Sequence, residues 1–152
     1  MKLYIKYLLL ALVLVNFLFS CSDDEYTLED GYYTAEAAAF DSRGWKEYVT
    51  ICVSGGRIIL VEYNAFNASG FIRSWDMNYM RVMNAAKGTY PNAYTRYYGE
   101  RLLLQQGTDD VHHLSGATRS YQAFMQLAEA ALEKARQGDT ETSQVIFSGD
   151  SN

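Results

Sequence analysis

The segment 45–66 constrains the fold most strongly, because apolar and polar residues alternate on both sides of a Gly-Gly pair. Alternation of this kind is typical of strands with one buried face. Gly55-Gly56 has the composition of a tight hairpin turn. The residues that the alternation assigns to the buried face are Val49, Ile51 and Val53 before the turn, and Ile59, Val61, Tyr63 and Ala65 after it. The segment therefore predicts an antiparallel hairpin made of the strands 45–54 and 57–66.

A further strand is predicted upstream of this hairpin, over residues 31–40. If this segment is extended, Tyr33 and three alanines lie on one face. The turn-forming run Asp41-Ser42-Arg43-Gly44 separates it from the next strand. Together the three segments predict a three-stranded antiparallel meander.

Helices are predicted in the second half of the chain. Ser74 is a candidate cap for a helix that runs to about Lys87. Pro91 suits the first turn of a second helix, which we expect to end at Gly107. The third helix opens at the Ser-Gly-Ala-Thr motif and carries apolar residues at helical spacing as far as Gly138. The polar segment 139–152 contains Val145-Ile146-Phe147, which is expected to form a short edge strand or to fray. An α+β fold follows, with a meander followed by helices.

The N-terminal segment resembles an export signal. Lys2 and Lys6 precede an apolar run that is too short for a confident membrane span. The run ends in Leu18-Phe19-Ser20-Cys21, which resembles a bacterial lipobox, in which the Cys is lipidated. The alternatives are an uncleaved anchor or an ordinary signal peptide. The expected organisation is a lipoprotein signal peptide (1–20), the lipidated Cys21 with an acidic tether (21–30), one folded domain (31–138) and a polar tail (139–152). Each alternative places the domain on the extracytoplasmic face of the cell envelope, for example in the periplasm.

Composition excludes several classes of function. The formal net charge is −5, and cleavage of a leader that contains Lys2 and Lys6 makes it more negative, which argues against nucleic acid as a partner. If Cys21 carries lipid, Cys52 has no partner for a disulfide and is expected to be a small buried hydrophobe. His112 and His113 are adjacent and lack the spaced partners of a metal site, so no metal site is predicted. A hydrolytic set of Ser115, a His and Asp109 or Asp110 is a minor alternative without a nucleophile elbow. We predict no catalytic residue.

The segment Ser115-Gly116-Ala117-Thr118 is the main candidate for a binding site. It lies just before a predicted helix, where free backbone N–H groups and the positive end of the helix dipole favour an anion such as phosphate. Gly116 and Ala117 would allow close approach to the backbone, and Arg119 adds a local positive charge. The alternative is that Ser115 or Thr118 only caps the helix.

In the order and spacing of its motifs the chain resembles the bacterial FMN-binding domain family. This family includes flavin subunits of the Rnf and Na⁺-translocating NADH:quinone reductase complexes, and the nearest likeness is to short membrane-anchored lipoproteins called major membrane immunogens. The matching motifs are Asp30-Gly31-Tyr32-Tyr33, Gly44-Trp45-Lys46, the Gly-Gly hairpin into Arg57-Ile58, Asp76 to Met83, and Ser-Gly-Ala-Thr before the last helix. The likeness extends over about residues 31–136.

The resemblance implies a cofactor and a site. In flavinylated members the last residue of the motif is joined to the FMN phosphate by a phosphoester bond that a flavin transferase makes, and here that residue is Thr118. Ser115, Gly116 and Ala117 correspond to the backbone cradle. The family's pattern has Asp three residues before the Ser, where this chain has His112. FMN bound covalently at Thr118 and FMN bound reversibly are therefore both expectations.

The resemblance implies an extracytoplasmic, lipid-anchored FMN protein that carries electrons for a membrane redox complex rather than acting as a self-sufficient enzyme. The alternative is a flavin-free envelope lipoprotein that serves as a binding, structural or antigenic module.

Overall fold

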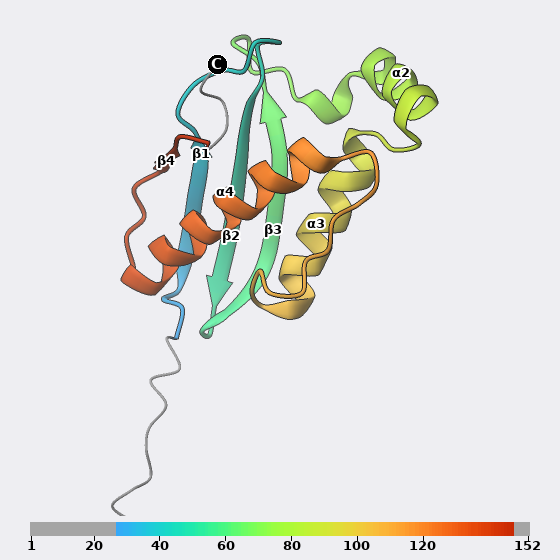
Figure 1. The fold of residues 1–152 in the computed structure, drawn as a ribbon. Coiled ribbons are helices and arrows are strands. Elements are labelled where there is room, and N and C mark those ends of the chain that lie inside the picture. The colour runs from blue at the N-terminus through green and yellow to red at the C-terminus, as the bar shows by residue number, and fades with distance from the viewer. Residues whose placement is uncertain (1–26, 148–152) are drawn as a thin grey trace, which may run out of the picture.

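The computed structural model describes residues 27–147, which form a four-stranded sheet with helices on one face and along one edge (Figure 1). This arrangement confirms the predicted α+β class. The elements in chain order are β1 (Gly31–Ala37), β2 (Lys46–Ser54), β3 (Arg57–Phe66), the short 3-10 helix η1 (Arg73–Trp75), α2 (Met77–Lys87), α3 (Pro91–Gln105), α4 (Thr118–Gln137) and β4 (Ser143–Val145). The predicted leader and Cys21 lie outside the described residues.

The predicted meander is confirmed, and a fourth strand extends it. The strand order is β3-β2-β1-β4, with β1–β2 and β2–β3 antiparallel and β4 parallel to β1. Ala35 pairs with Ser143, and Ala37 pairs with Val145. Part of the segment 139–152 is therefore hydrogen-bonded to the first strand of the sheet.

The core lies between the sheet and α4, which crosses β1 and β2 (Figure 1). Most of the sheet residues predicted for this face are buried, namely Tyr33, Ala35, Ala37, Val49, Ile51, Val53, Tyr63 and Ala65. The exceptions are Ile59, which is 57% exposed, Val61, which is half-buried, and Ala39, which lies beyond the end of β1 and is exposed. A β-bulge explains the wrong prediction at Ile59, since Val53 pairs with Ile58 whereas Cys52 pairs with Leu60. The extra residue shifts the alternation, so Ile58 is buried in place of Ile59.

The helix ends follow local chemistry, with two corrections to the predicted boundaries. Asp76, not Ser74, caps α2, because its Oδ1 accepts a hydrogen bond from the Tyr79 N–H at 2.9 Å. The Ser74 hydroxyl instead accepts a bond from the Asn64 amide at 2.8 Å. Gly88, Pro91 and Gly138 occupy the predicted end, start and end positions of α2, α3 and α4.

The second correction concerns the end of α3, where Gln106 rather than Gly107 has the left-handed conformation, with φ 61°. Its side chain explains this. The Gln106 amide accepts a bond from the Ile58 N–H at 2.8 Å and donates to the Ile58 carbonyl at 3.0 Å. The amide therefore bonds β3 as a neighbouring strand would, and α3 follows the outer edge of the sheet. Among residues 27–147, no helix is long and apolar enough to cross a membrane.

Candidate functional site

The Ser-Gly-Ala-Thr segment lies at the start of α4, as predicted. Thr118 is the first residue of the helix and Ala117 is its N-cap. Ala117 is buried, while Ser115, Thr118 and Arg119 are exposed. The structure thus presents these exposed side chains at the N-terminal end of the longest helix.

No side chain caps this helix. The N-cap is Ala117, whose side chain has no hydrogen-bond acceptor, rather than Ser115 or Thr118. The first bond of the helix runs from the Tyr121 N–H to the Ala117 carbonyl at 2.8 Å. The first N–H groups of an α-helix have no acceptor within the helix itself. The uncapped start of this twenty-residue helix is suited to an anionic ligand.

The Thr118 hydroxyl has a partner that the sequence did not predict. Its Oγ1 lies 2.9 Å from His113 Nε2. The His113 ring packs edge-on against Tyr121, with ring centroids 5.7 Å apart. In the tautomer with an unprotonated Nε2, His113 accepts the hydrogen bond of Thr118. His113 thus contacts Thr118 and not Ser115, and both His112 and His113 are exposed.

Gly116 allows the loop before α4 to pack closely against the segment after α2. Its φ is 81°, in the left-handed region that favours glycine. A Cβ atom at this position would lie 2.5 Å from the Lys87 carbonyl oxygen and 3.1 Å from Thr89 Cγ2. The motif therefore requires glycine here for a backbone reason, in addition to any role in binding.

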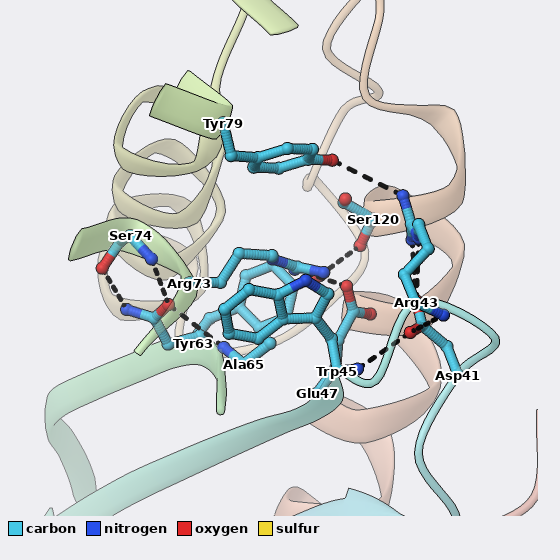
Figure 2. Close-up of polar contacts among 11 residues, drawn as sticks. Asp41, Arg43, Trp45, Glu47, Tyr63, Ala65, Arg73, Ser74, Tyr79 and Ser120 are labelled. Atoms are coloured by element: carbon cyan, nitrogen blue, oxygen red, sulfur yellow. Dashed lines mark hydrogen bonds and ion pairs between the residues drawn. The ribbon is translucent and has the colours of Figure 1, made fainter. Parts of the chain in front are cut away.

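The first turn of α4 rests on a buried polar cluster (Figure 2). The Tyr63 hydroxyl donates to the Ser120 carbonyl at 2.8 Å, and burial raises the pKa of Tyr63 well above its usual value. Beside Tyr63, Arg73 of η1 is 1% exposed and forms an ion pair with Glu47 at 2.5 Å. Burial alone lowers the pKa of Arg73, but the charge of Glu47 outweighs it and the net pKa is raised. The cluster fixes the helix start relative to β2 and β3.

The loop between β1 and β2 lies on the same side of the molecule (Figure 2). Asp41 accepts bonds from the Trp45 N–H at 2.9 Å and from the Arg43 guanidinium at 2.8 Å. Arg43 also approaches the Tyr79 hydroxyl of α2 at 3.5 Å. Burial raises the pKa of Asp41. These hydrogen bonds and the Arg43 charge have a larger, opposite effect, so the net pKa is below the usual value.

Other candidate residues lie away from this site. Cys52 is a buried free thiol on the sheet, as predicted. A cleft of about 650 Å³ runs between β3 and α3, and its lining includes Tyr48, Trp75 and Arg96. None of the residues Ser115–Arg119 lines this cleft. The structure therefore separates this cleft from the candidate site at the start of α4.

Comparison with known proteins shows a similar lipoprotein and a similar crystal structure. No family model matches the sequence. The chain is 34% identical over 131 residues to the 15 kDa lipoprotein of Treponema pallidum (strain Nichols), covering 86% of this chain and 92% of that protein. It is also similar to the crystal structure of the CPE2226 protein from Clostridium perfringens, with a TM-score of 0.75 and 34% identity over 80% of this chain and 99% of that one.

Proposed function

The chain belongs to the family of the 15 kDa lipoprotein of Treponema pallidum, and from this premise we propose that it is a lipid-anchored envelope protein that binds FMN at the start of α4. The phosphate lies at the first turn of α4, and Thr118 Oγ1 is the atom for covalent attachment. The protein then carries electrons between a membrane donor and another carrier. The lipid anchor is at Cys21.

The observation that carries the proposal is the uncapped start of α4 with the Thr118 hydroxyl exposed beside His113. Most helix starts use a side chain to satisfy an N–H group. Asp76 does so for α2 of this chain, whereas α3, which begins with Pro91, and α4 have no such side chain. At α4, no side chain caps the helix, and the positive end of the helix dipole favours a ligand phosphate beside Thr118. The rival hypothesis, in which Ser115 or Thr118 only caps α4, lacks this support.

The residues around Thr118 fit a phosphate group by charge and shape. Gly116 keeps the loop free of a side chain, and Arg119 contributes a positive charge in the first turn. His113 orients the Thr118 hydroxyl and is placed to accept its proton. When bound, FMN supplies the one- and two-electron chemistry, and the protein supplies binding and orientation.

The test is the intact mass of the full chain after co-expression with a flavin transferase. We expect a gain of one FMN less water, fluorescence of the band on a denaturing gel, and loss of both in Thr118→Val. The matched control is Thr142→Val, because Thr142 is an exposed threonine after α4. The control should keep the full gain.

A chain without the mass gain is then titrated with FMN. Reversible binding that weakens in Thr118→Val would support the proposed FMN site and would exclude covalent attachment at Thr118. A blank titration would refute the flavin proposal and favour the flavin-free envelope module.

A further inference from the structure

The point at which the N-terminal tether enters the fold is fixed beside the hairpin between β2 and β3. The Gly56 N–H donates to Asp30 Oδ1 at 3.2 Å. The Glu29 N–H donates to the Ala135 carbonyl at 2.9 Å, which holds the same segment against α4. The chain therefore emerges from the domain at the hairpin end of the sheet, where β1 begins (Figure 1).

Three large apolar side chains are exposed at this end, and we call Tyr32, Ile59 and Leu60 the hairpin patch. Their exposed fractions are 66%, 57% and 47%. Tyr32 and Leu60 both pair with Cys52, so they lie on the sheet face opposite α4, about 10 Å apart across two strand spacings. Ile59 is the bulged residue that the register shift turns outward. Grouped apolar exposure of this kind is typical of an interaction surface.

The length of chain before the domain limits what can cover the hairpin patch. From Cys21 to Leu28 a fully extended chain spans at most about 25 Å. A lipid on Cys21 therefore keeps the patch close to the bilayer surface at all times. Tethering makes the contact intramolecular, so even a weak apolar surface remains in frequent contact with the lipid headgroups.

Charge argues that this contact is apolar and not electrostatic. Glu29 and Asp30 flank the entry point, and the chain as a whole is acidic, so anionic lipid gives no attraction. A tyrosine with an apolar body and a polar tip suits the headgroup region. Arg57, which is exposed at the start of β3, can cover apolar surface with its stem while its charged end stays in water.

We propose that the hairpin patch lies in the headgroup interface of the membrane that holds the Cys21 lipid. Glu47, beside the candidate site, pairs with Ala65 at the opposite end of the β2–β3 ladder from the hairpin. In this orientation the start of α4 and the helix α2 face away from the membrane, toward soluble partners. The proposal rests on the lipid anchor and is independent of flavin binding.

The test places one fluorescent probe at two equally exposed positions of the full lipidated chain. An NBD group is attached to Ile59→Cys or, as the matched control, to Val82→Cys on α2, which are 57% and 58% exposed in the native chain. Both are made in a Cys52→Ser background, in phosphatidylcholine vesicles that contain spin-labelled lipid. We expect blue-shifted, quenched emission at position 59, unquenched emission at position 82, and no dependence on salt.

Two further measurements decide whether the hairpin patch contacts the membrane or a second copy of the chain. Adding Tyr32→Ser and Leu60→Ser, which change exposed side chains only, should abolish the quenching at position 59 and leave the circular dichroism unchanged. Equal quenching at positions 59 and 82, or quenching that survives these substitutions, would overturn the proposal. A blue shift at position 59 in chains without lipid, at concentrations where they sediment as dimers, would assign the patch to a second copy instead.

Discussion

At the scale of single residues, Gly116 shows how a binding motif can be fixed by packing. Its left-handed φ of 81° and the approach of the Lys87 carbonyl both exclude a side chain. Gly70 has nearly the same φ, 80°, but a Cβ there would meet nothing within 4 Å. A substitution at Gly70 would therefore introduce backbone strain alone, whereas one at Gly116 would introduce backbone strain and steric overlap.

We predict that Gly116→Ala lowers the free energy of unfolding by about 3 kcal/mol, and Gly70→Ala by about 1 kcal/mol. The difference arises because the new methyl group at position 116 must displace the Lys87–Thr89 segment. Urea denaturation of both variants measures it. Equal losses would mean that the loop moves away without cost.

The sequence located the candidate site but not its internal contacts. The position of Thr118 at a helix start followed from small residues ahead of an amphipathic run. The contact between His113 and Thr118 did not, because a hydrogen bond between residues five apart in a loop depends on the path of the backbone. An adjacent pair of histidines gave no signal for which of them would turn toward Thr118.

At the scale of elements, the end of α3 protects the edge of the sheet. An edge strand presents unpaired backbone groups that invite another strand. The Gln106 amide bonds both the N–H and the carbonyl of Ile58, and it also donates to the Leu103 carbonyl at 2.6 Å. These bonds hold a non-glycine residue in the left-handed conformation.

Shortening this side chain should open the edge. Gln106→Asn keeps an amide that tolerates left-handed φ but is one methylene too short to reach Ile58. We predict a loss of about 1–2 kcal/mol in the free energy of unfolding and faster hydrogen exchange at the Ile58 N–H. Gln105→Asn, an exposed neighbour, is the control. Unchanged exchange at Ile58 would show that α3 alone protects the edge.

Periodicity predicted the strands, and capping residues predicted most helix ends. The failures arise where a bulge, a side-chain contact or a long-range pairing decides the outcome. The alternation gave the buried faces of β1 and β2, but a single bulged residue moved Ile59 to the surface. Ser74 and Asp76 are both good caps by type, and only the contact with Asn64 decides that Asp76 takes the role. The pairing of β4 with β1 joins segments that local patterns cannot relate.

At the scale of the whole molecule, stability should depend on pH through Asp41. The pKa of Asp41 is lower in the folded state than in the unfolded chain, so its ionised form stabilises the native state. This contribution is complete at pH values above the ordinary Asp pKa of about 3.9. It is lost as the pH falls through the folded-state pKa. We predict that Asp41→Asn lowers stability at pH 7 by less than about 1 kcal/mol, since the group is partly exposed. The difference from the native chain should vanish in acid. Urea midpoints across the acid range measure it, and a constant difference would exclude ionisation as the cause.

The placement of β1 has a mechanical consequence for an anchored protein. The strand that continues the predicted tether is an inner strand, with β2 on one side and β4 on the other. A pull on the anchor is therefore directed along β1 and is shared by two hydrogen-bonded ladders, so that both must slide before the strand can leave. Chain termini fray unless a sheet holds them, and here the sheet holds the end of the domain that carries the load.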